Sequence, residues 1–240
     1  MSNSDLPTIY GFNKSSDGGP DSFGISIFLS GCNMRCPYCM NSRLVSRTDL
    51  KAVSFEDVSQ YILENKVKWV TISGGEPTMS RNLPILIKRI KKLGSKVNLC
   101  TNGLNPEAIE QVLDDLSYVT LDIKTNNHEI YEKWTNELSI KEKALTNVIF
   151  TKCKLITSKM KRDDFDYEIR TTIVPKFVNE QTISEISGII AKGEKWVLQK
   201  FRRTPDVSDE AGEEDVSDEN ILKIADVVRK NGKEVEVRYI

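Results

Sequence analysis

The order of apolar and polar positions predicts strands and helices that alternate along most of the chain. The apolar run at 23–29 predicts a buried strand. Ser54 has the chemistry of a helix N-cap, and apolar residues at helical spacing follow it to about Asn65. Five further strands are predicted at 68–72, 96–100, 118–123, 167–174 and 195–199, a sixth at 234–239, and further helices at 83–93, 106–116, 139–160, 182–192 and 220–230.

This alternation, with short links, is typical of right-handed β/α units that build a curved parallel sheet. About six such units form a partial (β/α)6 barrel, so the expected fold class is α/β. We expect one domain over residues 1–240, with its core at 23–205 and a C-terminal helix and strand at 220–240. Residues 1–22, which are polar and rich in glycine, predict an irregular lead-in. Residues 206–219 hold eight acidic residues and no basic one, which predicts a solvated loop.

Composition narrows the possible partners and the location. A formal net charge of −1 with 29% charged residues gives no overall field that would favour nucleic acid or an anionic membrane. The amino-terminal residues are polar, and no apolar run approaches the ~20 residues that span a bilayer. Five cysteines, three of them crowded together, do not resemble a secreted disulfide framework. We therefore expect a cytoplasmic protein without a nucleic-acid or membrane partner.

The crowded cysteines, Cys32, Cys36 and Cys39, have the spacing C-x3-C-x2-C. A loop this short can bring three thiolates to one metal centre. A closed zinc site or an ordinary iron–sulfur centre needs four protein ligands, so three leave one coordination position open for another molecule. The alternative is a structural zinc site with a fourth ligand from elsewhere in the chain, for which the candidates are Cys100, Cys153 and His128.

The other polar motifs follow successive predicted strands. Because the carboxyl ends of parallel strands meet at one rim of such a sheet, these motifs and the cysteine loop are expected to converge there. In chain order the candidates are Gly74, Gly75, Glu76 and Pro77, then Thr101 and Asn102, then Asp122 and Lys124, and finally Arg170 and Thr172.

The cysteine motif with Tyr38 before its last cysteine, together with Gly74-Gly75-Glu76-Pro77 after the next strand, resembles the radical S-adenosylmethionine (SAM) superfamily. Within that superfamily the chain is similar to the glycyl-radical-enzyme activases, especially the archaeal type of anaerobic ribonucleoside-triphosphate reductase activating protein. The motifs at 101–103, 122–124, 167–175 and 197–201 extend the resemblance over roughly residues 20–205.

The resemblance implies a [4Fe–4S] cluster on Cys32, Cys36 and Cys39 whose open iron binds SAM. One electron then cleaves SAM to methionine and a 5′-deoxyadenosyl radical, and the radical takes a Cα hydrogen from a glycine of a partner enzyme. The first candidate for that partner is anaerobic ribonucleotide reductase. A flavodoxin- or ferredoxin-type protein is the expected electron donor.

The resemblance also implies roles for the rim. Gly74 and Gly75 would let the backbone approach the cofactor, Glu76 would accept from its ammonium group, and Pro77 would stiffen the turn. Tyr38, Thr101, Asn102, Asp122 and Lys124 would lie near the cofactor, and Arg170 and Thr172 would contact its carboxylate or ribose. Pyruvate formate-lyase activases have an aspartate before Thr-Asn-Gly that is thought to help hold a monovalent cation. Here the residue is Cys100, and a thiol is a poor ligand for such a cation.

Two other functions fit the same motifs. One is radical chemistry on a small molecule, a peptide or a nucleotide, and the other is a metal-binding or electron-transfer module without catalysis. The activase is favoured because the chain has no second cysteine cluster and no ferredoxin-like insert after Met40.

Overall fold

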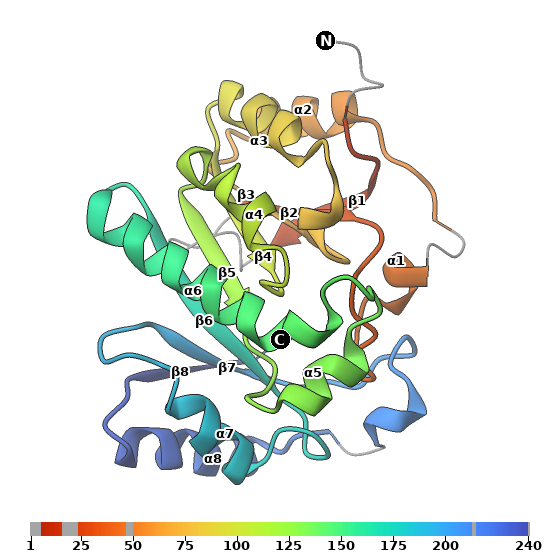
Figure 1. Cartoon of the computed structure of the whole chain (residues 1–240). Coiled ribbons are helices and arrows are strands. Elements are labelled where there is room, and N and C mark those ends of the chain that lie inside the picture. Colours follow the sequence, from red (N-terminus) through yellow and green to blue (C-terminus); the bar gives the residue numbers. More distant parts are fainter. Residues whose placement is uncertain (1–5, 16–23, 47–49, 213–214, 240) are drawn as a thin grey trace.

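The computed structural model describes residues 6–15, 24–46, 50–212 and 215–239, and the described residues are built around one eight-stranded sheet (Figure 1). The strands neighbour one another in chain order. The first pair, β1 with β2, is antiparallel, and every later pair is parallel. The strands are β1 (Ile9–Ser15), β2 (Gly24–Leu29), β3 (Trp69–Gly74), β4 (Lys96–Thr101), β5 (Tyr118–Asp122), β6 (Asp166–Ile173), β7 (Trp196–Lys200) and β8 (Val235–Arg238).

Each parallel connection contains at least one helix, as expected for β/α units. The α-helices are α1 (Ser42–Ser46), α2 (Phe55–Glu64), α3 (Leu83–Lys92), α4 (Pro106–Glu110), α5 (His128–Trp134), α6 (Ala144–Lys161), α7 (Glu180–Ser187) and α8 (Asp218–Lys230). The short 3₁₀ helices are η2 (Pro77–Met79), η3 (Leu113–Asp115), η4 (Lys141–Lys143) and η5 (Asp209–Ala211). The predicted α/β class with a curved, mostly parallel sheet is confirmed.

The two faces of the sheet differ in polarity because successive strand residues point to opposite sides. Ile72, Leu99 and Leu121 are fully buried in the hydrophobic core that the helices share. The residues between such positions are polar. Nδ2 of Asn98 donates to Thr71 Oγ1 at 3.2 Å, and so links β4 to β3. The sheet therefore has one apolar face and one face that carries polar groups toward the ends of the strands.

The structure corrects the prediction that 1–22 is an irregular lead-in, because Ile9–Ser15 forms β1. This strand contains Gly11, and its pairing with β2 shifts register between Ile9 and Phe12, so it lacks a regular two-residue pattern. The predictions for 1–5 and 16–22 lie outside the described residues. Helix α5 was not predicted at all; it begins at an N-cap, Asn127, whose side chain accepts from the N–H groups of Glu129 and Ile130.

Three other predicted helices have different bounds, and the one predicted at 182–192 is α7 at Glu180–Ser187. The segment predicted as one helix at 106–116 is the short α4 followed by η3, and α6 begins at Ala144 rather than near residue 139. Among the described residues, no helix combines the length and apolar character needed to cross a bilayer.

Glu168 on β6 and Arg238 on β8 form an ion pair that spans β7. The two guanidinium amino groups donate to the two carboxylate oxygens at 2.9 and 3.1 Å, and Glu168 is 3% exposed. Burial alone would raise the pKa of Glu168, but the hydrogen bonds and charge of Arg238 outweigh it and lower that pKa. The pair therefore favours the ionised carboxylate in the folded protein.

We expect Glu168→Gln to lower the free energy of unfolding by roughly 2 kcal/mol at neutral pH. Because the pKa is lower in the folded state, the advantage of glutamate is complete above its unfolded pKa, near 4.3, and is lost as the pH falls through the folded value. Urea unfolding of both forms from pH 7 to pH 3 measures this. Glu236→Gln, which alters a more exposed carboxylate bound to the same arginine, should cost less at neutral pH. A difference between parent and Glu168→Gln that does not shrink in acid would contradict the assignment.

Candidate cofactor and cluster site

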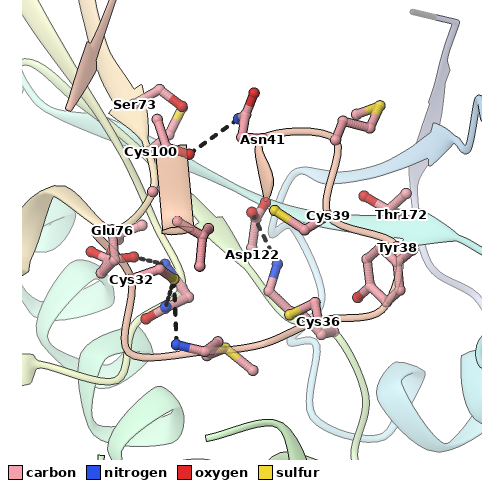
Figure 2. Close-up of a pocket in the computed structure, with 18 of the residues that line it drawn as sticks. Cys32, Cys36, Tyr38, Cys39, Asn41, Ser73, Glu76, Cys100, Asp122 and Thr172 are labelled. Atoms are coloured by element: carbon pink, nitrogen blue, oxygen red, sulfur yellow. Dashed lines mark hydrogen bonds and ion pairs between the residues drawn. The ribbon is translucent and has the colours of Figure 1, made fainter. Parts of the chain in front are cut away.

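A pocket lies where β3 to β7 end, beneath the loop that follows β2 (Figure 2). Cys32, Cys36 and Cys39 all line it. Of the other predicted site residues, all but Pro77 line the same pocket: Tyr38, Gly74, Gly75, Glu76, Thr101, Asn102, Asp122, Lys124, Arg170 and Thr172. Pro77 is buried at the start of η2 instead. The structure thus brings together residues that lie far apart in the sequence.

The three thiols suit a cluster better than a single ion. The described residues contain no group of three His, Cys, Asp or Glu side chains arranged to hold one metal ion. In an iron–sulfur cluster each thiolate binds a different iron, so the sulfurs do not need to meet at one point. Burial raises the pKa of Cys32 to about 12 and that of Cys36 to about 11, and so disfavours free thiolates in the absence of metal.

Gly74 and Gly75 allow close packing of the β3 end against the β2 end. A Cβ on Gly74 would lie 2.2 Å from Leu29 O, and one on Gly75 would lie 2.0 Å from Gly31 O. Gly75 N donates to Leu29 O and Glu76 N donates to Gly31 O, at 2.9 and 2.8 Å. The close packing of the two strand ends therefore requires glycine at both positions, in addition to the predicted approach of the backbone to a cofactor.

Glu76 connects the turn after β3 to the turn after β4. Its Oε1 accepts from Thr78 N, Thr78 Oγ1 and Thr101 Oγ1 at 3.1, 2.6 and 2.7 Å, and its Oε2 accepts from Asn102 N at 2.7 Å. Burial raises the pKa of Glu76, and these four donors oppose the rise. Because Oε2 receives one hydrogen bond, it keeps room for another donor from the pocket.

We expect Glu76→Gln to lower the free energy of unfolding by roughly 2–3 kcal/mol, because the amide NH₂ would face an N–H or O–H donor and leave it unsatisfied. Anaerobic urea unfolding of the metal-free protein measures this loss without any contribution from the cofactor. The matched control is Glu64→Gln, which changes an exposed carboxylate on α2 that accepts from Gln60, and it should cost much less. Equal stability of Glu76→Gln and parent would show that the four hydrogen bonds are not important for folding.

Asp122, Lys124 and Arg170 form a charged group in the pocket wall. Asp122 Oδ1 accepts from Arg170 Nε at 2.7 Å, and Oδ2 lies 3.3 Å from Lys124 Nζ. Burial would raise the pKa of Asp122, but the two cations lower it; in return Asp122 raises the pKa of Lys124 against the effect of burial. All three groups are therefore charged at neutral pH, with one net positive charge.

Tyr38 holds the cysteine loop against α5. Its ring lies edge-on to Trp134 of α5 at 5.5 Å, and both rings contact Phe177. The backbone adds to this contact, because Arg35 N donates to Trp134 O at 2.7 Å. The Tyr38 hydroxyl is buried and has no partner among the described residues, and burial raises its pKa.

Asn41 lines the pocket and was not predicted as a site residue; Ser73 and Gln199 also line it, and both lie at strand ends that were expected at the rim. Asn41 Nδ2 donates to Gly74 O at 3.1 Å and so ties the cysteine loop to the Gly-Gly turn. Its position two residues after Cys39 was the available signal. Cys100 also lines the pocket and is nearly buried, whereas Cys153 is exposed on α6 and His128 lies at the start of α5.

The family model described as the radical SAM superfamily matches residues 26–148, just over half of the chain. The chain belongs to the radical SAM superfamily. Enzymes of this superfamily use a [4Fe–4S] cluster and SAM, and the matched region contains the three cysteines and the Gly-Gly-Glu-Pro turn. The three thiols, the open side of Glu76 and the cationic wall group fit these cofactors.

The chain is similar to proteins from more than one branch of the superfamily. The chain is 29% identical over 218 residues to the Methanocaldococcus jannaschii protein named "Putative glycyl-radical enzyme activating enzyme MJ1227", covering 89% of this chain and 88% of that protein. A domain of pyruvate-formate lyase-activating enzyme from Bacteroides vulgatus has a similar fold, with a TM-score of 0.52 and 18% identity over 70% of this chain and 98% of that domain. A radical SAM methyltransferase from Sphaerobacter thermophilus has a TM-score of 0.66 and 13% identity over 98% of this chain and 77% of that chain.

Proposed function

We propose that this protein activates a glycyl-radical enzyme. With its cluster and SAM bound, it would accept one electron and cleave SAM to methionine and a 5′-deoxyadenosyl radical, which removes a Cα hydrogen from a glycine of the partner. That hydrogen is weakly held, because the glycyl radical is delocalised over the adjacent amide groups. The proposed partner is anaerobic ribonucleotide reductase.

The observation that carries this proposal is the similarity to MJ1227 over nearly the full length of both chains. A similarity confined to the cofactor motifs would support only the superfamily. The sequence adds that its five cysteines include a single cluster motif, so no auxiliary cluster is expected. The five cysteines are free thiols in the structure, in keeping with a reducing cytoplasm. The proposed electron donor is a flavodoxin- or ferredoxin-type protein.

The residues of the chain have separate tasks in this proposal. Cys32, Cys36 and Cys39 would hold the cluster, and the free side of Glu76 would accept from the ammonium of SAM. Arg170 uses Nε on Asp122, so its two amino nitrogens are available for the carboxylate of SAM. We also propose that residues 1–240 form one domain.

Electron paramagnetic resonance (EPR) tests the proposal. The reconstituted protein is incubated without oxygen with SAM, a reductant and anaerobic ribonucleotide reductase from the same organism. A glycyl radical doublet on the reductase, absent when SAM is omitted, is the expected result. A parallel assay counts 5′-deoxyadenosine per radical formed, since a true activase makes about one for each glycine.

The other functions give different outcomes. SAM cleavage without a glycyl signal on any glycyl-radical enzyme of the organism, together with turnover of a small substrate, would reject the activase. No 5′-deoxyadenosine from a reduced, iron-loaded protein would reject radical chemistry altogether and leave a metal-binding module.

A further inference from the structure

The side chains of Asn33 and Asn102 form a buried amide pair beside the first cysteine of the motif. Asn33 is 2% exposed and Asn102 is 5% exposed. Asn102 Nδ2 donates to Asn33 Oδ1 at 2.7 Å and lies 3.9 Å from Cys32 Sγ. The pair joins the cysteine loop to the turn after β4, which are 69 residues apart in the sequence.

A hydrogen bond from the backbone fixes which end of the Asn102 amide faces the sulfur. Leu104 N donates to Asn102 Oδ1 at 3.0 Å, and only the oxygen of the amide can accept. Nδ2 must therefore point toward Asn33 and Cys32. Asn33 then presents Oδ1 to Asn102, and its own Nδ2 is a buried donor without a partner among the described residues.

This arrangement costs stability. A buried donor left unpaired is destabilising, whereas two apolar side chains of similar shape would carry no such penalty. The sulfur of Cys32 also receives the backbone N–H of Met34 at 3.4 Å. Two N–H groups thus point at the Cys32 sulfur. One belongs to the Asn102 side chain, whose amide nitrogen and oxygen are both held by hydrogen bonds. A distance of 3.9 Å is long for a hydrogen bond, so the Asn102 amide acts mainly as a dipole on the charge of the sulfur.

We propose that Asn102, oriented by Leu104 and Asn33, raises the reduction potential of the cluster by directing its amide N–H at the Cys32 sulfur. Hydrogen bonds to the sulfurs are among the factors that set the potential of such clusters, because N–H dipoles stabilise the more negative, reduced state. The step is the uptake of one electron from the external reductant, which takes [4Fe–4S]²⁺ to [4Fe–4S]⁺; no bond breaks and no proton moves. The inference rests on the cluster ligation in the proposed function.

A redox titration followed by EPR, in the absence of SAM, tests this inference. The parent and Asn102→Leu are reconstituted anaerobically, and the iron content of each is measured. The expected result is equal iron and a more negative midpoint potential in Asn102→Leu. The control is Asn105→Leu, which removes another amide from the same turn, one that donates to Thr78 O at 3.1 Å, and it should leave the potential unchanged.

A second variant covers the case in which Asn102→Leu does not fold. In Asn102→Ser the hydroxyl can still accept from Leu104 N but is too short to reach Cys32, so the same negative shift is expected. An unchanged midpoint in either iron-loaded variant would overturn the inference while leaving the proposed function intact. A parent that binds no iron would overturn both.

Discussion

Replacing Cys36 with alanine is expected to abolish both iron loading and SAM cleavage. Two thiolates would remain for a cluster that needs three protein ligands. Two of its irons, and no longer only one, would then have no protein ligand. No other cysteine can substitute without moving the backbone, since Cys153 is exposed on α6 and Cys100 sits on β4, across the pocket from the cysteine loop. Iron analysis and the brown visible absorbance measure loading, and chromatography of 5′-deoxyadenosine measures cleavage. Both should fall to background.

Cys153→Ala is the matched control, because it removes one thiol and leaves the pocket unchanged. It should load iron and cleave SAM as the parent does. If Cys36→Ala kept its chromophore and its cleavage, the assignment of the three ligands would be wrong. Loss of both in Cys153→Ala would point instead to a general requirement for free thiols.

Replacing Gly75 with alanine is expected to destabilise the protein by roughly 3 kcal/mol, even without any cofactor. The new Cβ would lie 2.0 Å from Gly31 O and 2.7 Å from Gly31 C, and both are backbone atoms that cannot swing aside. Relief requires the cysteine loop to move away from β3. Urea unfolding of the metal-free protein should show a lower midpoint with an unchanged slope.

Gly94→Ala separates this overlap from the general effect of losing a glycine. Gly94 has φ +90°, and a Cβ added there would have no neighbouring atom within 4 Å, so alanine meets only backbone strain, worth about 1 kcal/mol. Equal losses in the two variants would contradict the packing role given to Gly75. A much larger loss in Gly75→Ala, accompanied by poor iron loading, would connect the packing to the cysteine loop.

The regular part of the fold follows from local sequence. Helices α2 and α3 match their predicted ranges closely, because Ser54 supplies a cap and Gly94 a stop at the ends of clear apolar stripes. The strand β1 and the helix α5 could not be predicted in this way. The first is irregular and is held by pairing with β2, and the second is a short helix whose Trp134 is buried against Tyr38. Both depend on contacts with the cysteine loop or the strand that leads into it.

The residues that form the site could be predicted from the sequence, but the hydrogen bonds between them could not. Because parallel strands end at one rim, the predicted site residues were expected to meet there. All of them except Pro77, which begins η2, line the pocket. Sequence spacing could not show that Glu76 receives hydrogen bonds from two turns, since the donors on the turn after β4 depend on how β3 and β4 align. Asn33 and Asn41 were missed for the same reason: each is an ordinary polar residue whose partner lies at or just after the end of another strand.

The agreement between strand order and chain order has a consequence for synthesis on the ribosome. Each strand pairs with the strand made just before it, so the sheet can lengthen as the chain emerges. The three thiols, the Gly-Gly turn and the turn after β4 are made before β5, whereas α5, which packs on the cysteine loop, follows β5. The ion pair of Glu168 with Arg238 must wait for β8. A nascent chain can therefore present its metal ligands while the far edge of its sheet is still open.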